Sequence, residues 1–583
     1  MKHVVANLVN DALEKLPELA AAAADLSVDT TVERTRDASH GDFACNVAMR
    51  LAKPARKSPR DIANSIVEAL GDNALVAKVE IAGPGFINFY LSPSAFHAEL
   101  NTILDNGADY GRQEKKAAPK ILLEFISANP TGPLHVGHGR HAAYGASVGN
   151  LLEAAGYPVH REYYVNDAGR QMDILGASVW LRWMESHEVK IPFPNAGYRG
   201  DYIRDIASEI DTSGLAVSKA DEVLDGLPGQ DTAEDFEPYV EALIAKAKAL
   251  LGEDGFDRIR QQSLESILAD IKDDLEGFGV TFDKWYSEQS LTKTGRIDDA
   301  LAVLEKRGML YKKDGATWFP ATDFGDEKDR VVVRENGVKT YFASDIAYHF
   351  DKRERGFDHL IDILGADHHG YIARVRAGLE AMGYQGDDLE VELVQFVTLY
   401  RGGEKMQMST RSGEFDTLRQ LRAEVGNDAA RFYYVMRSND QHLDFDLDIA
   451  TSQSNDNPVY YIQYAHARIA RVFRKANESS MSWDAQNGRS QLSLLTAPQE
   501  KSLMSAMSRY PEILDLAAKN RAPQTLVHFL RELVSDFHSS YNAHKVLVDD
   551  ANLRDARLTL YATVKIVVAN GLAILGVGAP DEM

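Results

Sequence analysis

Two histidines three positions apart, His135 and His138, follow a loop that contains two prolines. The loop follows the apolar run Ile121 to Ile126, whose length and content are typical of a buried parallel strand. A helix-like segment, Gly139 to Ala155, comes next, and a strand, a loop and a helix start in this order commonly bind phosphate. Two imidazoles there could donate hydrogen bonds to phosphate oxygens, and Gly137 would leave room for a nucleotide between them.

The same histidines could instead be metal ligands, or surface residues on the first turn of a helix. A metal site is poorly supported, because the chain has a single cysteine, Cys45, and no third ligand stands near the pair. We therefore expect no structural metal bound by the protein itself.

A second group of polar residues follows the apolar run Leu360 to Leu364, which predicts another buried strand. The carboxyl end of such a strand is the edge where doubly wound sheets bind ligands. The residues delivered there are Gly365, Asp367 and His368. Just before this strand, Tyr341 and Asp345 are four positions apart, which puts both side chains on one face if that segment is helical.

A third segment, residues 401–413, has glycines at both ends and carries the cations Lys405 and Arg411. Glycines of this kind predict a loop that can move, so its cations could swing onto a triphosphate.

The elements around these residues predict how they are positioned. Strand candidates at 121–126 and 159–165, each followed by a helix-like segment, predict a parallel, right-handed, doubly wound sheet of the Rossmann type. A chain of 583 residues is too long for one core. We expect an α/β multidomain protein, in which an N-terminal α+β domain and an all-α C-terminal domain flank the sheet domain. Their expected limits are 1–110, 115–425 with a mostly helical insertion around 185–280, and 426–583.

The overall charge limits the possible partners. A formal charge of -23 argues, taken alone, against a nucleic-acid partner, so any RNA contact should use a confined basic surface and be salt-sensitive. The N-terminus lacks the apolar core of a signal peptide, and no apolar run suggests a membrane span. One cysteine fits a reducing cytoplasm. We expect a cytoplasmic protein with no membrane partner.

Two surfaces could nevertheless meet RNA. In an extended strand, Phe86, Asn88 and Tyr90 share one face and offer two rings and an amide, which could stack on and hydrogen-bond unpaired bases. Packing against a neighbouring helix is an equally good explanation of that face. A cationic stripe at helical spacing is the second surface, unless it is simply a solvated helix face. Its residues are Arg468, Arg471 and Lys475.

The segment Ser127 to Arg140, Ser-Ala-Asn-Pro-Thr-Gly-Pro-Leu-His-Val-Gly-His-Gly-Arg, resembles the ATP-binding signature of class I aminoacyl-tRNA synthetases. The form is the one that bacterial arginyl-tRNA synthetases carry. Residues 36–46 resemble part of the N-terminal domain of that family, which holds the D-loop corner of tRNA. Residues 428–432, 443–446 and 457–468 resemble its anticodon-binding domain. The resemblance covers essentially the whole chain.

The loop at 401–413 departs from the class pattern. Met408-Ser409-Thr410-Arg411 resembles the second class I signature, but Gln407 and Thr410 replace its two lysines. Some arginyl enzymes with an altered loop place a lysine before the first histidine, and Gly132 occupies that position here. The sequence therefore leaves open which cation meets the phosphates, with Lys405 and Arg411 as the candidates.

The resemblance implies an enzyme that activates L-arginine with Mg²⁺-bound ATP and transfers it to the 3′-terminal adenosine of tRNA(Arg), with activation waiting for bound tRNA. The implied catalytic residues are His135, His138, Lys405 and Arg411. The implied ATP contacts are Pro130, Thr131, Gly132, His135, Gly137, His138, Gly365, Asp367, His368, Met408 and Ser409. The implied arginine contacts are Glu124, Ser127, Asn129, His135, Tyr341 and Asp345. The implied tRNA contacts are Phe86, Asn88, Tyr90, Tyr461, Arg468, Arg471 and Lys475.

Three alternatives stay open at this point. Glu124 could form a strand-surface salt bridge and take no part in arginine binding. A nucleotidyltransferase shares the H-x-G-H phosphate chemistry, although such enzymes are usually short and lack a long helical C-terminal domain. A tRNA-binding relative without activity is the third, and the intact set of Asn129, His135, His138 and Asp367 argues against it. We expect a monomer.

Overall fold

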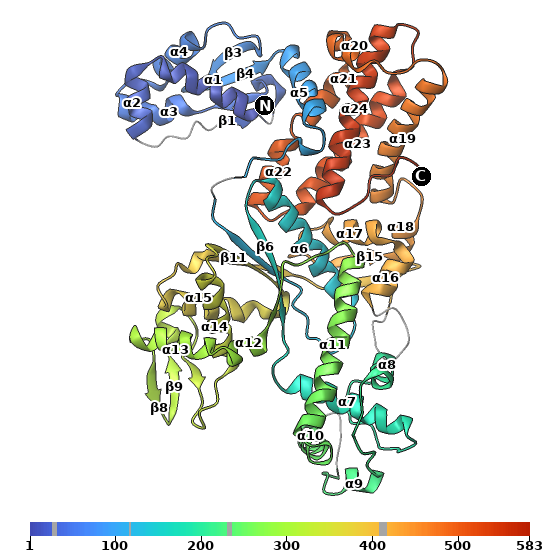
Figure 1. The fold of residues 1–583 in the computed structure, drawn as a ribbon. Helices are drawn as coiled ribbons and strands as arrows, with labels where there is room; N and C mark the ends of the chain where they lie inside the picture. The colour runs from blue at the N-terminus through green and yellow to red at the C-terminus, as the bar shows by residue number, and fades with distance from the viewer. Residues whose placement is uncertain (26–31, 36, 116–117, 230–235, 407–416) are drawn as a thin grey trace. The chain divides into compact units, whose positions relative to one another are not determined.

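The computed structural model describes residues 1–25, 32–35, 37–115, 118–229, 236–406 and 417–583 (Figure 1). Two compact units make up this part of the chain. The first unit comprises Met1–Gln113, Ser454–Ile574 and Gly578–Met583, and the second comprises Glu114–Gln453 and Leu575–Val577.

The second unit is built on a five-stranded parallel sheet. From edge to edge its strands are β12 (Leu389–Val394), β11 (His359–Gly365), β5 (Ile121–Phe125), β6 (Val159–Val165) and β7 (Lys284–Ser287). The chain enters in the middle at β5, runs to one edge through β6 and β7, and returns to the other side as β11 and β12. This order confirms the predicted doubly wound sheet, and its switch point, where such sheets bind ligands, lies between β5 and β11.

Helix α6 (Val136–Ala154) joins β5 to β6 and is fixed from two sides. A Cβ atom at Gly145 would collide with the ring of Phe125 on β5, so glycine is what lets the helix approach the strand closely. On another side, the hydroxyl of Tyr434 in α17 (Asn427–Val435) donates a hydrogen bond to the Val136 carbonyl at 2.7 Å. The start of α6 is therefore held rigidly at the end of β5.

Three segments connect the strands that follow β6. Between β6 and β7 lie α7 (Arg170–Ser186), α8 (Asp201–Glu209), α9 (Ala220–Leu224), α10 (Glu237–Leu251) and α11 (Glu253–Gly277). Between β7 and β11 lie α12 (Glu288–Lys293), α13 (Arg296–Lys306), β8 (Tyr311–Lys313), β9 (Ala316–Phe319), η3 (Ala321–Phe324), β10 (Arg330–Val333) and α14 (Tyr341–Glu354). Between β11 and β12 lie η4 (Ala366–Tyr371), α15 (Ile372–Ala381) and η5 (Gly386–Asp388). The second segment contributes most of a separate apolar core, in which α13 and α14 pack with the antiparallel strands β9 and β10 and with α15.

A small second sheet follows β12. Strand β13 (Val397–Arg401) pairs with the antiparallel β14 (Glu404–Lys405) and with the parallel β15 (Leu443–Asp446). Helices α16 (Leu418–Val425), α17 and α18 (Leu447–Thr451) accompany it. Residues 443–446, whose motif pointed to the C-terminal helical region, thus pair with β13 inside the second unit.

The N-terminal part of the first unit is a four-stranded antiparallel sheet covered by helices (Figure 1). Its strands, in spatial order, are β1 (Val32–Arg34), β2 (Phe43–Cys45), β4 (Phe86–Leu91) and β3 (Val76–Ala82). Its helices are α1 (Lys2–Glu14), α2 (Pro17–Asp25), η1 (Ala38–His40), α3 (Val47–Ala55), α4 (Pro59–Leu70), α5 (Pro93–Asn106) and η2 (Gly107–Asp109). Phe43, Ile87 and Phe89 are buried in the core between the sheet and the helices.

The rest of the first unit is helical in its described residues. Its helices are α19 (Pro458–Glu478), α20 (Ala485–Ser490), η6 (Leu492–Leu494), α21 (Pro498–Met507), α22 (Tyr510–Lys519), α23 (Pro523–Ala543) and α24 (Ala551–Ile574). Helices α19, α23 and α24 pack side by side (Figure 1). Helix α24 is long and apolar enough to cross a membrane, which the sequence reasoning overlooked, but 61% of its most apolar window is buried. That burial is typical of a core helix.

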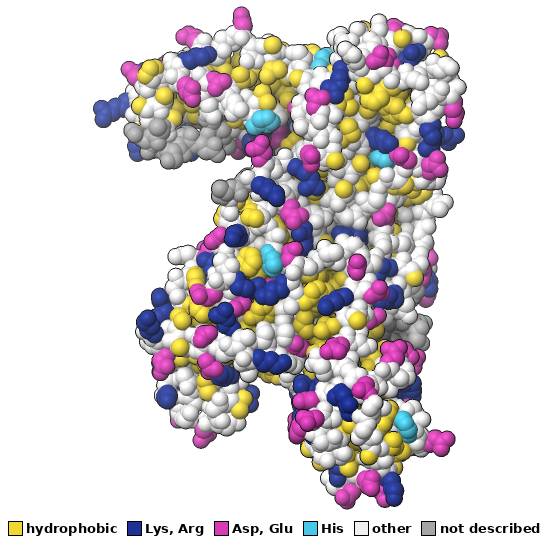
Figure 2. All heavy atoms as spheres, in the orientation of Figure 1, with side chains coloured by type: hydrophobic (Ala, Val, Ile, Leu, Met, Phe, Trp, Pro, Cys, Tyr) yellow, Lys and Arg dark blue, Asp and Glu magenta, His cyan; other side chains and the backbone are white. Residues whose placement is uncertain are grey.

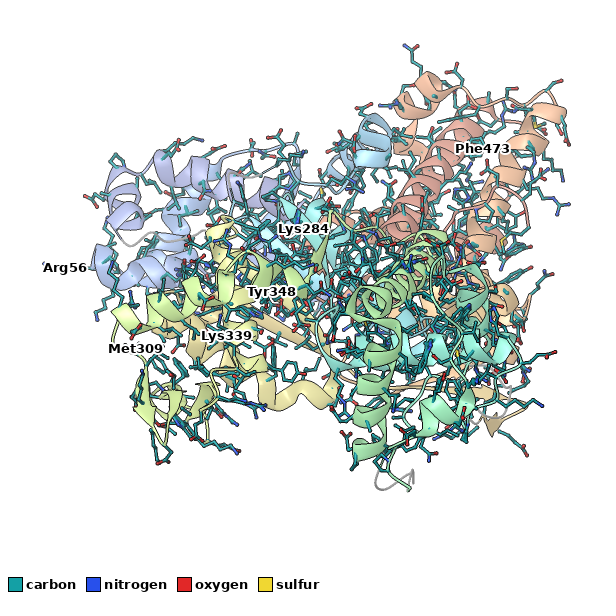
Figure 3. The ribbon with its side chains drawn as sticks, turned by 60° about the horizontal axis from the view of Figure 1, so that its bottom comes forward. Arg56, Lys284, Met309, Lys339, Tyr348 and Phe473 are labelled. Carbon is teal, nitrogen blue, oxygen red and sulfur yellow. The ribbon has the colours of Figure 1, made fainter. Side chains whose placement is uncertain are left out.

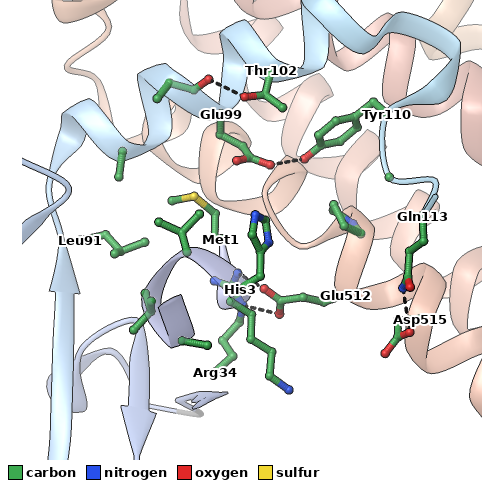
Figure 4. A pocket seen from close by; sticks show the side chains of 18 of the residues that line it. Met1, His3, Arg34, Leu91, Glu99, Thr102, Tyr110, Gln113, Glu512 and Asp515 are labelled. Carbon is green, nitrogen blue, oxygen red and sulfur yellow. Dashed lines mark hydrogen bonds and ion pairs between the residues drawn. The ribbon is translucent and has the colours of Figure 1, made fainter. Parts of the chain in front are cut away.

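A pocket of about 1050 Å³ opens in the first unit between α1, α5 and α22 (Figure 4). Charged pairs line it: the Tyr110 hydroxyl donates to Glu99 at 2.6 Å, and Arg34 forms an ion pair with Glu512 at 3.1 Å (Figure 4). The residues predicted for ATP or arginine do not line this pocket.

Candidate active site

The two histidines close the start of α6 with each other. His135 is the N-cap, its Nδ1 accepts the backbone N–H of His138 at 3.3 Å, and Nδ1 of His138 accepts the backbone N–H of His135 at 3.3 Å. This reciprocal capping box explains why α6 begins at Val136, three residues before the predicted Gly139. Because each Nδ1 accepts a hydrogen bond, each neutral ring carries its proton on Nε2.

The rings of His135 and His138 stack directly on each other, with centroids 3.5 Å apart and planes at 19°. The expected space for a nucleotide between them is therefore absent. Gly137 instead makes room for the stacked rings, because a Cβ there would lie 2.9 Å from the His135 ring. Burial, with the charges of His135 and His141, holds the pKa of His138 well below its usual value. A neutral His138 can donate through Nε2 to an anion.

The loop after β5 begins with an unusual backbone. Ile126 and Ser127 both have positive φ, 72° and 42°, a conformation that a β-branched residue adopts only under constraint. The turn brings Ser127 Oγ within 2.9 Å of Glu124 Oε1 and lets it accept the N–H of Tyr164 at 3.1 Å. The strained turn therefore fixes the first polar residues of the loop.

The next part of the loop is held by the insertion. The Tyr202 hydroxyl, from α8, donates to the Thr131 carbonyl at 2.7 Å. A Cβ at Gly132 would lie 2.9 Å from that hydroxyl. A lysine side chain at this position would have to displace Tyr202. Pro130 is buried beside them.

At the other side of the switch point, β11 ends at Gly365 and leads into η4. The carboxylate of Asp367 lies over Gly365, because a Cβ there would be 2.7 Å from Asp367 Oδ1. Asp367 is exposed, so it is accessible to a ligand at the sheet edge. The side chain of His368 lies outside the described residues.

The described structure resumes after the second signature beside the first signature. Lys405 is exposed at the end of β14. At the other end, Thr417 pairs with His135, and the Leu418 N–H donates to the Leu134 carbonyl at 2.8 Å. The predicted contacts Met408, Ser409 and Arg411 fall in residues 407–416, outside the described part.

Arg140, in the second turn of α6, is a cation close to the predicted phosphate site. It is 1% exposed and donates to three carbonyls, those of Gln395 at 2.8 Å, Gln441 at 2.7 Å and Ser438 at 2.8 Å. Burial lowers its pKa to about 10. Its guanidinium anchors the segments around β13 and β15 and is directed away from a phosphate role.

Tyr341 and Asp345 lie on one face of α14, because the segment is helical as the spacing required. Tyr341 is 69% exposed, so its ring is open to a ligand. Burial raises the pKa of Asp345 to about 6, even though His349 and Tyr371 act in the other direction. A positively charged ligand would stabilise the ionised form of this carboxylate.

The sequence reasoning missed a second carboxylate at this place. Glu288 opens α12 and is 8% exposed, and no hydrogen-bond partner is found for its buried Oε2 among the described residues. Burial and the nearby charges of Asp345 and Asp167 raise the pKa of Glu288 to about 7. Asp167 fixes α12 by accepting from Ser287 Oγ at 2.5 Å and from the Gln289 N–H at 2.9 Å.

Glu124, Ser127 and Asn129 all leave β5 toward the same edge. Glu124 is 6% exposed, and its Oε2 accepts from Lys352 Nζ at 2.6 Å. The salt bridge considered as an alternative therefore exists, but it is buried and leaves Glu124 beside Ser127. Asn129 is exposed, and its Oδ1 accepts from Asn166 Nδ2 at 3.0 Å.

The predicted tRNA-binding face of β4 is only partly exposed. Phe86 is 40% exposed and Tyr90 half-buried, with Lys78 Nζ 4.9 Å from its ring centroid. Asn88, however, is 4% exposed, because its own domain covers the middle of the strand. An RNA base would meet the two rings more readily than the amide.

Aromatic and cationic groups gather between α19 and α23. The Arg468 guanidinium lies 4.0 Å from the Tyr541 ring centroid and 3.2 Å from His538 Nδ1, so it points into a cluster that also includes Tyr461, whose ring is 5.0 Å from His538. Arg471 and Lys475 are exposed on α19. On the face shown in Figure 2, positive and negative side chains are interspersed, so any basic surface there is local.

In the part of the chain that the structure describes, no group of three His, Cys, Asp or Glu side chains is arranged to hold a metal ion. Each of the paired histidines accepts the backbone N–H of the other through Nδ1, which leaves only Nε2 for contact with a ligand.

A doubly wound sheet whose first helix starts with His-Val-Gly-His at the switch point has the architecture of a class I aminoacyl-tRNA synthetase, and a family model confirms that class. The model of the class I (R) tRNA synthetase catalytic domain matches residues 99–446. The arginyl-tRNA synthetase N-terminal domain matches residues 3–91, and the DALR anticodon-binding domain matches residues 462–583.

Individual relatives agree with these models. The arginine–tRNA ligase of Thioalkalivibrio sulfidiphilus is 56% identical over 586 residues, and that of Halorhodospira halophila is 53% identical, each covering 100% of both chains. The Thermus thermophilus arginyl-tRNA synthetase structure shares the fold, with a TM-score of 0.73 over 100% of both chains at 23% identity. This chain belongs to the arginyl-tRNA synthetase family. Its activity is the ATP-dependent attachment of arginine to tRNA(Arg).

Proposed function

We propose that both chemical steps take place at the carboxyl edge of the five-stranded sheet, on the two sides of the β5–β11 switch point. One observation carries this assignment: two buried carboxylates with raised pKa values, Asp345 and Glu288, belong to the same sheet edge as a helix start capped by two histidines. The carboxylates can bind the guanidinium of arginine, and the helix start can bind the phosphates of ATP.

The phosphate side would work through N–H donors. In activation the arginine carboxylate attacks the α-phosphorus, a new C–O–P linkage forms, and the bond to pyrophosphate breaks. Charge then grows on phosphate oxygens, which positioned donors and cations stabilise. We assign this role to Nε2–H of His135 and His138, and to Lys405 and Arg411. Magnesium arrives with ATP as part of the substrate.

The nucleoside would lie along the loop and the end of β11. The carboxylate of Asp367, which is exposed over Gly365, would hold the ribose hydroxyls. We assign the remaining ATP contacts to Pro130, Thr131, Gly132, Gly137, His368, Met408 and Ser409.

The amino-acid side would recognise a planar guanidinium by two carboxylates and a ring. Asp345 and Glu288 offer acceptors for its N–H groups, and the exposed Tyr341 ring offers a flat surface. Glu124, Ser127 and Asn129 would hold the α-amino end, with His135 near the carboxylate. Adding Glu288 changes the expected recognition from one carboxylate to two.

For tRNA we assign Phe86, Asn88 and Tyr90 to the D-loop corner, and Tyr461, Arg468, Arg471 and Lys475 to the anticodon loop. We keep the three-domain division, with the second boundary moved from 425 to near Gln453, since β15 pairs with β13. We propose that the enzyme is a cytoplasmic monomer and that arginine activation waits for bound tRNA.

ATP–pyrophosphate exchange with arginine, measured with and without tRNA(Arg), tests this proposal. We expect exchange only with all three substrates present. Exchange with arginine but without tRNA would disprove the tRNA requirement alone. A nucleotidyltransferase would show exchange independent of arginine, and a binding protein without activity would show none.

A further inference from the structure

A buried polar layer lies beneath the proposed arginine pocket, between α14 and the sheet. Lys352, on α14, is 0% exposed, and its Nζ donates to Glu124 Oε2 at 2.6 Å and to Asp362 Oδ1 at 2.8 Å. The other oxygen of Asp362, Oδ2, lies 2.7 Å from Nε2 of His349, one turn earlier on the helix. A lysine with no exposed surface needs partners of opposite charge inside the protein, because burying an unpaired charge is costly.

The polar side chains of this layer pair with one another. Nδ1 of His349 lies 2.9 Å from the Asp345 carbonyl, which can only accept, and Nε2 faces a carboxylate that already accepts from Lys352. Nδ1 of His349 therefore acts as a donor to this carbonyl. Burial alone would raise the pKa of Asp362, but Lys352 and His349 hold it well below its usual value. The two carboxylates Glu124 and Asp362 thus share the Lys352 cation, and His349 contacts Asp362 from the other side.

The sheet register explains why the cations are needed. Asp362 on β11, Glu124 on β5 and Glu162 on β6 are direct neighbours across three parallel strands. Like charges side by side on one face of a sheet repel each other, so each needs a donor from the covering helix. Lys352 serves the first two, and Arg355 serves Glu162 with contacts of 2.6 and 2.8 Å.

Both ends of the Lys352 layer are residues assigned to arginine. Glu124 accepts from Lys352 through Oε2 and from Ser127 through Oε1, which leaves its orientation fully set. At the other end, His349 holds the backbone of Asp345. We propose that Lys352 is a positioning residue that fixes Glu124 and, through Asp362 and His349, the Asp345 turn, for arginine binding. This inference rests on the proposed arginine pocket.

The ion pair one strand away is a matched control. Glu162 is 0% exposed and is held by Arg355 and by the Tyr348 hydroxyl at 2.8 Å (Figure 3 labels Tyr348). Arg355 is the C-cap residue of the same helix, three positions after Lys352. Neither Glu162 nor Arg355 belongs to the proposed substrate contacts. A purely structural role for the buried layer predicts the same outcome for both pairs.

The experiment compares Lys352→Met with Arg355→Met in tRNA-dependent pyrophosphate exchange. We expect Lys352→Met to raise the arginine KM about ten- to a hundredfold, as for a lost charge-assisted hydrogen bond. Its ATP KM should stay within about threefold, as should both constants of Arg355→Met. Melting temperatures of both variants give the structural cost.

Should Lys352→Met fail to fold, the pair Lys352→Met/Asp362→Asn removes one charge of each sign and keeps the layer balanced. The arginine defect should persist in that double variant, because Glu124 still lacks its donor. An arginine KM within threefold of wild type in either folded variant overturns the inference. The proposed function fails separately, if wild-type protein shows no arginine-dependent exchange.

Discussion

The two sides of the proposed site meet at one sheet edge but use charge in different ways. On the proposed phosphate side, the fixed groups are two imidazoles whose Nδ1 atoms cap a helix, and the assigned cations belong to a loop. On the arginine side, the fixed groups are buried charges, Asp345 and Glu288 above and the Lys352 layer below. Pyrophosphate must leave after activation, whereas the guanidinium keeps its charge throughout.

This difference suggests a physical reason for each design. A permanent buried cation under the triphosphate would hold the product as strongly as the substrate, which does not speed the chemical step. A guanidinium does not change during the reaction, so rigid opposite charges can select it without cost to turnover. Variants on the two sides should therefore fail in different kinetic constants.

The largest effect is expected at the arginine side. Asp345→Asn removes half of the neutralising charge from a buried cation, which costs about 3–5 kcal/mol. The arginine KM should rise steeply in the exchange assay while the ATP KM barely moves. Asp351→Asn is a matched control, since this buried residue of α14 pairs with Arg296 at 3.2 Å and Arg355 at 2.9 Å, outside the pocket. Equal losses for both substrates in Asp345→Asn would contradict the assignment.

The next effect is on the phosphate side. His138→Ala removes one donor to the phosphates and one half of the helix cap, so exchange should fall about 10²–10³-fold in kcat. The lost cap should lower stability by only about 1 kcal/mol, which a melting curve measures. Arginine affinity, measured by calorimetry with tRNA present, should stay near wild type. An unchanged exchange rate would remove the histidines from the mechanism.

A smaller effect is expected from the loop cations. Arg411→Ala should lower kcat about tenfold or more, as for one charge-assisted contact, with little change in the ATP KM. Arg411 is favoured over Lys405 because it follows the position of the second missing lysine and its fork can hold two oxygens. Lys405→Ala is the comparison. Near wild-type rates in both would make these cations spectators, and Arg140 could not replace them, since three carbonyls hold it.

The signature residues and the doubly wound sheet could be predicted because they depend on local patterns. The run Ile121 to Ile126, the prolines after it and the histidine pair each restrict the backbone by themselves. Tyr341 and Asp345 were predictable for the same reason, since helical spacing alone puts them on one face.

Residues whose role depends on distant strands were not predictable. Glu288 has the sequence context of an ordinary acidic first turn of a helix, where such residues favour the helix dipole. Only the neighbourhood of Asp167 and Asp345 makes it a substrate candidate. Lys352 has the context of a surface lysine, and Asn88 that of an exposed strand residue. Their burial is set by what packs over them, which alternation along one strand cannot reveal.

The last prediction concerns the cost of keeping the arginine pocket empty. The folded pKa of Glu288 is about 7, above its ordinary value of 4.5, because of burial and the charges of Asp345 and Asp167. Between these values the native state binds more protons than the unfolded state, so the stability of the ligand-free enzyme falls as pH rises. The penalty is absent below about pH 4.5 and complete above about pH 7.

Glu288→Gln should therefore raise the melting temperature of the ligand-free enzyme at pH 8 and not at pH 5. The gain should be on the order of 2 kcal/mol, since a buried amide replaces a buried charge. The same variant should bind arginine more weakly. Glu162→Gln is the control of opposite sign: burial would raise the pKa of Glu162, but Arg355 leaves it lowered, so its loss should destabilise at pH 8. Equal melting temperatures for Glu288→Gln and wild type at pH 8 would show that the empty pocket stores no such repulsion.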